Sequence, residues 1–282
     1  MVRDALINAV VDRGEGTYPY DQAKSQKTTI QKVMFRDFRA IGVLSKPDSN
    51  LMCAQCHVEY ACNPGFDPKT GESIDMTHRR TNYFPWVNVL DLQKRYEEVG
   101  FKDFRHAITG APLTKLQHPE SETFWGSTHE RKGVECQDCH MPKIKNKAGK
   151  TYTFHGQRSA RYMKKDTCVR CHPSWTQAEA EYQIDAIQNY IRGKITKAKF
   201  WLGQLIDKFK EAKMAGVPEE TLRQAREYHD TAHILWEWWT AENSDGFHNP
   251  SLARESLTRS LNASQDGIKL LDKALADLRA KK

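Results

Sequence analysis

Three copies of the pattern Cys-x-x-Cys-His constrain this chain more than any other feature of its sequence. They are Cys53, Cys56 and His57; Cys136, Cys139 and His140; and Cys168, Cys171 and His172. The spacing suits covalent haem attachment, in which two thioether bonds hold the porphyrin and the next residue lies under the iron. Zinc sites and redox dithiols do not need that histidine, and a disulfide framework has no reason to repeat one spacing. We therefore expect three covalently attached haem c groups.

An electron-transfer haem usually takes a second axial ligand, so the remaining histidines are candidates. They are His78, His106, His118, His129, His155, His229, His233 and His248. His229 and His233 also have the i, i+4 spacing of a metal-chelating pair, although no third ligand is evident near them. The seventh cysteine, Cys62, is most simply a small packed thiol.

Composition excludes several classes of protein. The 282 residues carry a net charge of +7, with Lys and Arg scattered along the chain, which is not the clustered pattern of a nucleic-acid-binding protein. The mean hydropathy is -0.74, and no apolar run approaches the roughly 20 residues of a membrane helix. The first 15 residues lack the unbroken apolar core of a secretory signal.

The pattern of elements indicates a mainly α protein in two parts. Residues 1–174 form the haem-bearing part, with a helical lead-in over residues 1–52, a polar loop at GEGTYPYD, and short helices and loops around the motifs. One alternating stretch, KTYTF at 150–154, predicts a strand. Residues 175–282 show apolar positions at steps of three and four, which predicts three long helices.

Helix ends in the second part are marked by Gly216 and Pro218, and by Asn249 as N-cap before Pro250. The apolar seams of these helices could pack within one chain or form a coiled-coil-like dimer interface. Their length favours the dimer.

Four stretches resemble one family in order and over nearly the whole chain: CAQCHVEY (53–60), KLQHPE (115–120), CQDCHMP (136–142) and GFHNP (246–250). The family is that of the pentahaem cytochrome c nitrite reductases. The resemblance implies a periplasmic, mainly α multihaem cytochrome that reduces nitrite to ammonia with six electrons. The homodimer is expected from the long apolar seams.

The resemblance assigns catalytic roles to Tyr60 and His118, on the distal side of the active-site haem, where both can give protons to bound nitrite. It also implies a calcium site made by Glu59, Tyr60, Lys115 and Gln117. Tyr60 and Lys115 would contribute backbone carbonyls, which suits a cation that prefers oxygen ligands.

Three distal iron ligands follow from the same resemblance. His248 would ligate the haem on Cys136, Cys139 and His140, so the helical part would complete a haem of the first part. His129 would ligate the haem on Cys168, Cys171 and His172. His155 would ligate a haem whose motif lies upstream of this chain.

The family's catalytic CxxCK motif, the haem motif that follows it, a pocket arginine and the distal ligand of the His57 haem have no counterpart in residues 1–52. We expect this chain to be the C-terminal portion of a five-haem enzyme, with its signal peptide upstream. Alone, it would take up haem and calcium poorly and reduce nitrite slowly. The alternative is a shortened, non-catalytic electron-transfer cytochrome. The expected donor is a quinol-linked or soluble multihaem cytochrome, and any membrane association would be peripheral, through that partner.

Overall fold

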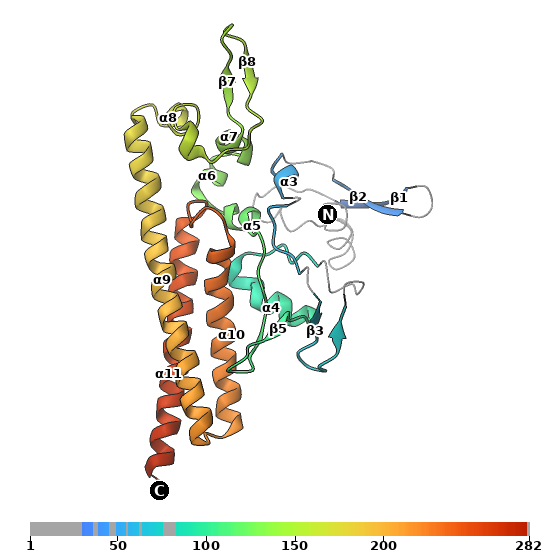
Figure 1. The fold of residues 1–282 in the computed structure, drawn as a ribbon. Helices are drawn as coiled ribbons and strands as arrows, with labels where there is room; N and C mark the ends of the chain where they lie inside the picture. Colours follow the sequence, from blue (N-terminus) through green and yellow to red (C-terminus); the bar gives the residue numbers. More distant parts are fainter. Residues whose placement is uncertain are drawn as a thin grey trace.

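The computed structural model describes residues 30–35, 39–44, 49–54, 56–61, 64–75 and 83–280. Cys62, His78 and the GEGTYPYD loop lie outside the described residues. The described part is mainly helical, as predicted, with short antiparallel strand pairs between the helices. Three long helices lie side by side along one flank, and the segments that carry the cysteine motifs lie beside and above them (Figure 1).

The helical lead-in predicted for residues 1–52 is wrong over residues 30–35 and 39–44, which are strands. Strand β1 (Ile30–Phe35) pairs antiparallel with β2 (Arg39–Leu44), with Ile30 opposite Leu44. Both strands contain β-branched residues, among them Ile30, Val33, Ile41 and Val43, which favour extended backbone. The cross-strand pairing outweighs the weak helical pattern of the segment.

Short elements make up the haem-bearing part. They are α3 (Asn50–Cys53), β3 (Gly65–Phe66), β4 (Ser73–Ile74), α4 (Val89–Val99), β5 (Phe104–Arg105), β6 (Pro112–Leu113), α5 (Glu120–Phe124), α6 (Thr128–Arg131), α7 (Cys136–His140), β7 (Lys143–Lys145), β8 (Thr151–Thr153), η1 (Ala160–Met163) and α8 (Cys168–Cys171). Strand β8 confirms the strand predicted from KTYTF, and it pairs with β7 in a projecting hairpin (Figure 1).

The predicted long helices are α9 (Gln177–Ala215), α10 (Glu219–Ala241) and α11 (Pro250–Ala280). Gly216 ends α9 with φ at 82°, a conformation that glycine adopts without strain. Pro218 lies just before α10, and α11 begins at Pro250. Asn249 Oδ1 accepts a hydrogen bond from the Leu252 amide at 3.3 Å. These breaks confirm the predicted helix ends.

The apolar seams of these helices pack within the chain. Leu205 and Phe209 of α9 are fully buried together with Leu271 of α11. A dimer would have to use other residues of the helices, so the homodimer stays a prediction.

The bundle also supports the haem-bearing part. Trp238 of α10 is fully buried, and its Nε1 donates to Thr123 Oγ1 of α5 at 2.8 Å. Tyr96 of α4 belongs to the same apolar cluster as Trp238. These contacts fix α4 and α5 against α10, and with them the loops that carry the candidate site. In the part of the chain that is described, no helix has the length and apolar character needed to cross a membrane.

Candidate haem and calcium sites

The three cysteine motifs lie on short helices that are neighbours in space. The Cys136 amide donates to Asn50 Oδ1 at 2.8 Å, which joins α7 to α3. A hydrogen bond with Cys136 lowers the pKa of Cys53 to about 6, against the opposing effect of burial. Burial and the nearby Cys168 raise the pKa of Cys139 to about 12. All six motif cysteines are free thiols, as thioether attachment requires.

Three of the predicted iron ligands have one ring nitrogen beside an oxygen atom, in a hydrogen bond at His57 and His140 and in an ion pair at His248. The Nδ1 atoms and their partners are His57 with Glu120 Oε2 (3.1 Å), His140 with the Arg158 carbonyl (2.9 Å) and His248 with Glu242 Oε1 (2.7 Å). Metal-ligating histidines are usually held in this way, because a partner at one nitrogen fixes the ring and leaves the other nitrogen for the metal. Nε2 is the nitrogen left for iron in each of these rings.

Two pairs of histidine rings lie edge to face at the separation expected of two axial ligands. The His140 and His248 ring centroids are 6.2 Å apart, and those of His129 and His172 are 6.5 Å apart. One metal ion between two imidazoles, with bonds of roughly 2.0–2.1 Å, places the centroids about 6.4 Å apart. The residues present therefore fit two haem irons with two histidine ligands each.

The electrostatics of these pairs favour neutral rings. Burial, then the neighbouring His172, lowers the pKa of His129. Burial, then His248, lowers the pKa of His140. Iron binding needs the unprotonated nitrogen, so the surroundings favour the ligating form. His57 differs, because its hydrogen bond with Glu120 raises its pKa.

The loop between α10 and α11 holds His248 against the haem-bearing part. Glu242 begins this loop, and its buried carboxylate accepts a hydrogen bond from the Gly246 amide at 3.3 Å. Gly246 has φ at 79°, and a Cβ added there would lie 2.7 Å from Ile191 Cγ2. The close approach to α9 thus requires glycine two residues before His248.

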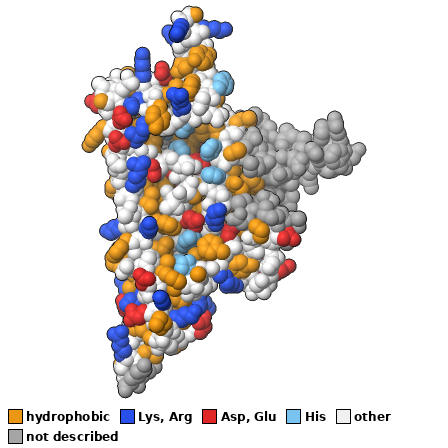
Figure 2. All heavy atoms as spheres, viewed as in Figure 1, with side chains coloured by type: hydrophobic (Ala, Val, Ile, Leu, Met, Phe, Trp, Pro, Cys, Tyr) orange, Lys and Arg blue, Asp and Glu red, His pale blue; other side chains and the backbone are white. Residues whose placement is uncertain are grey.

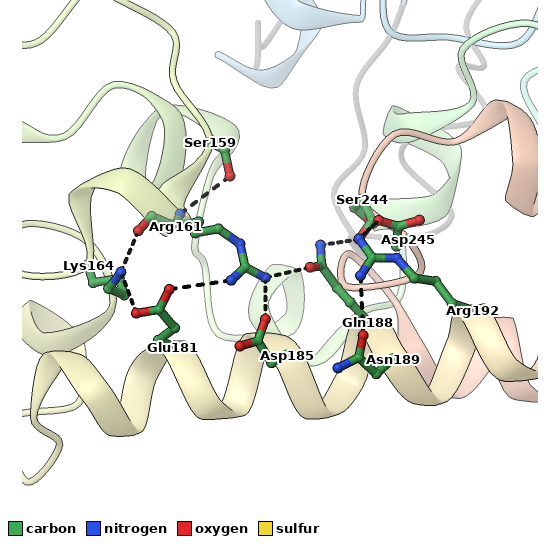
Figure 3. A network of polar contacts seen from close by, with 10 residues as sticks. All are labelled: Ser159, Arg161, Lys164, Glu181, Asp185, Gln188, Asn189, Arg192, Ser244 and Asp245. Carbon is green, nitrogen blue, oxygen red and sulfur yellow. Dashed lines mark hydrogen bonds and ion pairs between the residues drawn. The ribbon is translucent and has the colours of Figure 1, made fainter.

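Polar contacts along the first half of α9 fasten two further segments (Figure 3). The contacts are Arg161 with Asp185 (2.7 Å), Lys164 with Glu181 (3.1 Å), Gln188 with the Ser244 carbonyl (2.9 Å) and Arg192 with Asp245 (2.6 Å). They tie both the segment before α8 and the loop that carries His248 to one helix. A single rigid element therefore sets the relative positions of the third motif and His248.

The predicted calcium ligands come together around a buried carboxylate. Glu59 is fully buried; its Oε1 accepts from the Tyr96 hydroxyl at 2.7 Å and its Oε2 from the Gln117 amide at 2.7 Å. Lys115 lies two residues before Gln117, and its amide donates to Asp103 Oδ2 at 2.8 Å. Burial raises the pKa of Glu59 to about 8 and that of Asp103 to about 6.

Several buried polar atoms beside Glu59 have no hydrogen-bond partner among the described residues. They include Oε2 of Glu122, Oδ1 of Asp103 and the side-chain nitrogen of Gln117. Glu122 is fully buried, its Oε1 accepts from the Glu59 amide at 3.1 Å, and burial raises its pKa well above the usual range. Buried carboxylate oxygens without partners fit a hard cation such as calcium, which would offset their charge.

Tyr60 and His118 lie in adjacent segments, since each directly follows a residue of the Glu59–Gln117 contact. Tyr60 is half-buried and stacks on Phe84 with ring centroids 5.5 Å apart. The His118 side chain is exposed, as is that of His155 in the segment after β8. The fold thus gathers Tyr60 and His118 beside the carboxylates, and leaves His155 at the surface.

His229 and His233, the i, i+4 pair considered above as a metal chelate, contact neighbouring side chains of the protein. His229 Nδ1 is 2.9 Å from Thr109 Oγ1, and burial, then His106, lowers its pKa to about 3. His233 Nε2 is 2.5 Å from Glu237 Oε2. No group of three or more His, Cys, Asp or Glu side chains in the described part of the chain is arranged to hold a metal ion. The predicted calcium set contains only one such side chain, Glu59, and relies on carbonyl oxygens.

Sequence reasoning missed the acidic residues that surround the site. Glu120 and Glu242 orient histidines, and Glu122 and Asp103 lie beside Glu59. Of these four residues, only Glu120 could have been singled out from the sequence, because it is the last residue of the KLQHPE stretch.

One known protein family matches this chain. The sequence model of the cytochrome c552 family matches residues 24–282. The chain belongs to the cytochrome c552 family. Membership accounts for the three motifs and the mainly α fold of this cytochrome.

A solved structure similar to this cytochrome c552 chain is that of the cytochrome c nitrite reductase from Desulfovibrio desulfuricans ATCC 27774. The sequences are 29% identical, the TM-score is 0.69, and the match covers 81% of this chain and 50% of the other. That protein is a catalytic subunit, NrfA, with two calcium sites. The chain thus spans about half the length of this relative. The outer cell wall cytochrome OcwA matches at 19% identity and a TM-score of 0.40, covering 89% of this chain and 48% of the other.

Proposed function

We propose that this chain takes part in the reduction of nitrite to ammonia, as the larger C-terminal part of a cytochrome c nitrite reductase. The observation that carries the proposal is the combination of paired histidines at the separation of axial ligands with a buried carboxylate site beside Tyr60 and His118. A carrier of electrons needs the first feature and has no need of the second.

In this proposal, Tyr60 and His118 act on the substrate. Nitrite takes up protons as well as six electrons on its way to ammonia. A phenol and an imidazole can both donate hydrogen bonds to nitrite oxygens and pass protons to them. The stacking of Tyr60 on Phe84 would hold its ring, and the exposure of His118 would let it recover protons from solvent.

Calcium would be held by Glu59 and Gln117, with backbone carbonyls from Tyr60 and Lys115. Its charge would offset the buried carboxylates and fix the two loops that carry Tyr60 and His118. The orphaned oxygens of Glu122 and Asp103 support a cation at this place.

Haem c, when attached, supplies electron transfer and, at an iron with an open position, the binding of nitrite. The attachment residues are the cysteines and histidines of the three motifs, and five haems would be present in the full-length enzyme. His248 and His129 would serve as distal ligands, as their neighbouring rings, His140 and His172, support. His155 would ligate a further haem.

The remaining expectations follow from the same proposal. Residues 1–174 would form the multihaem part, and residues 175–282 a helical part that contributes His248 and a homodimer interface. The protein would be periplasmic, would accept electrons from a quinol-linked or soluble multihaem cytochrome, and would meet a membrane only through that partner.

The test is nitrite turnover with reduced methyl viologen, followed as nitrite consumed and ammonia formed. The Tyr60→Phe and His118→Ala variants would be made in the full-length five-haem enzyme, because this chain alone is expected to reduce nitrite slowly. The haem count of each protein would be checked by pyridine haemochrome spectra. We expect ammonia from the native protein and at least tenfold less from each variant. An absence of ammonia at full haem content, with normal electron uptake, would favour the alternative, a non-catalytic electron-transfer cytochrome.

A further inference from the structure

The charged side chains of the β7–β8 hairpin are all positive. Residues 139–165 contain no Asp or Glu. The cations in this interval are Lys143, Lys145, Lys147, Lys150, Arg158, Arg161, Lys164 and Lys165. Figure 2 shows Lys and Arg side chains on both sides of the projecting tip, which Figure 1 labels as β7 and β8.

The cations near α9 and those of the hairpin differ in their partners. Arg161 and Lys164 are neutralised by Glu181 and Asp185 of α9 (Figure 3). The four hairpin lysines are exposed and form no ion pair with any described residue. Their charge therefore acts on solvent and on whatever approaches the hairpin.

The hairpin is an ordered projection. Asn146 Oδ1 accepts from the amides of Ala148 and Lys150 at 3.0 and 2.9 Å. Gly149 completes the turn with φ at 77°. Ile144 and Tyr152 are directly opposite each other across the strands, and Tyr152 is 46% exposed. Because side chains alternate along a strand, Ile144 and Tyr152 share one face of the hairpin, and Lys143 and Lys145 lie on the other. The hairpin thus offers an apolar contact next to its positive charge, a combination typical of protein interfaces.

Both ends of the hairpin are attached to the second cysteine motif. Strand β7 begins at Lys143, three residues after His140. At the base, the Phe154 amide donates to the Pro142 carbonyl at 2.9 Å. His140 Nδ1 is 2.9 Å from the Arg158 carbonyl, beyond the second strand. A partner seated on the hairpin is therefore brought close to the haem attached at residues 136–140.

We propose that the β7–β8 hairpin is the docking arm for an acidic redox protein that delivers electrons to the haem-bearing segment beside it. The proposal rests on the proposed function for the presence of haem, and adds the site and the charge of the donor. Unpaired lysines attract a negatively charged partner over about 8–10 Å at physiological salt. Small contact areas of this kind suit transient electron-transfer complexes.

The test measures binding of a reduced flavodoxin, a small acidic redox protein, to the haem-loaded chain by fluorescence anisotropy at rising NaCl concentration. The arm variant is Lys145→Glu/Lys147→Glu/Lys150→Glu. The matched control, Lys197→Glu/Lys199→Glu/Lys210→Glu, makes the same change of net charge at exposed positions of α9. We expect the arm variant to bind at least tenfold more weakly at low salt and the control to change less than threefold.

Two further measurements complete the test. Electron uptake from reduced methyl viologen, which needs no docking, should be the same in all three proteins, since the lysines hold no haem. Equal loss of flavodoxin affinity in the arm and control variants would overturn the proposal. So would arm-dependent binding to phosphatidylserine vesicles without arm-dependent binding of flavodoxin, which would make the arm a membrane contact. Failure of the full-length enzyme to reduce nitrite with viologen would count against the proposed function and leave the binding result intact.

Discussion

Replacing Glu59 by glutamine tests the buried carboxylate at the centre of the candidate calcium site. Glutamine keeps the size of the side chain and removes the group that titrates. Burial raises the Glu59 pKa from 4.5 to about 8. Folded protein without calcium therefore keeps a proton that the unfolded chain releases above about pH 4.5.

The sign and size of the effect follow from that difference. The folded state binds the extra proton between pH 4.5 and about 8, so the free energy of unfolding falls as pH rises through this interval and is level above it. At about 1.4 kcal/mol for each pH unit, the fall is at most about 5 kcal/mol.

The Glu59→Gln variant loses this pH-dependent fall in the free energy of unfolding, but it also loses a smaller amount of stability at every pH. The Tyr96 hydroxyl and the Gln117 amide both donate to the Glu59 carboxylate. An amide has only one acceptor oxygen, so one donor loses its partner, which costs about 1–3 kcal/mol. Without calcium, the variant should be the less stable protein at pH 5. At pH 8.5 it should be the more stable one, by up to about 2–4 kcal/mol.

Calcium should reduce this difference at high pH, because it binds the charged carboxylate. At a concentration 100 times the dissociation constant it would stabilise the native protein by about 2.7 kcal/mol and the variant by little. The assay is urea unfolding of the haem-loaded protein, followed by tryptophan fluorescence at both pH values, with calcium or with EGTA. Glu98→Gln, at an exposed position of α4, is the control. A variant with the same pH dependence and the same response to calcium as the native protein would refute the reasoning.

Three other changes test separate parts of the structure. Glu242→Gln removes the charge 2.7 Å from His248 Nδ1 and should weaken iron ligation by His248 roughly 10- to 100-fold. The loss would be seen as a rise in high-spin haem in the absorption spectrum, and an unchanged spectrum would mean that Glu242 does not support iron ligation. Asp230→Asn leaves the buried ammonium of Lys102 without its partner at 2.5 Å and should lower the free energy of unfolding in urea by about 3–5 kcal/mol; a loss below 1 kcal/mol would contradict a buried pair. Leu271→Ala opens a cavity at a fully buried position of the bundle and should cost about 2–5 kcal/mol in the same assay, while a smaller loss would mean that the bundle closes around the missing side chain.

The sequence alone determined the local chemistry of the chain. A Cys-x-x-Cys-His segment specifies haem attachment within five residues, so it can be identified without any knowledge of the fold. Helix ends are equally local: Gly216, Pro218 and Asn249 act on the backbone within a few residues of themselves, and each prediction there was confirmed. The fold class follows from the same short-range periodicity.

The packing partner of a segment was less predictable where one local sequence pattern is compatible with two structures. The segment at 30–44 was predicted to be helical, and it forms β1 and β2, because hydrogen bonding between strands outweighs weak helical preference. An apolar seam looks the same whether a helix of the same chain or of a second chain covers it. Tertiary structure places the seams of α9 and α11 against each other within one chain.

Only the tertiary structure decided which acidic side chains surround the candidate sites. Glu120 is 63 residues from His57 in sequence, and Glu122 is 63 residues from Glu59, yet each pair is in direct contact. Contacts between residues so far apart in sequence produce no periodic sequence pattern. The residues next to these glutamates in sequence look like those next to any surface glutamate. Burial then changes the chemistry: a carboxyl group that would be ionised in water has its pKa raised to about 8 at Glu59, because the fold removes the water that would stabilise its charge.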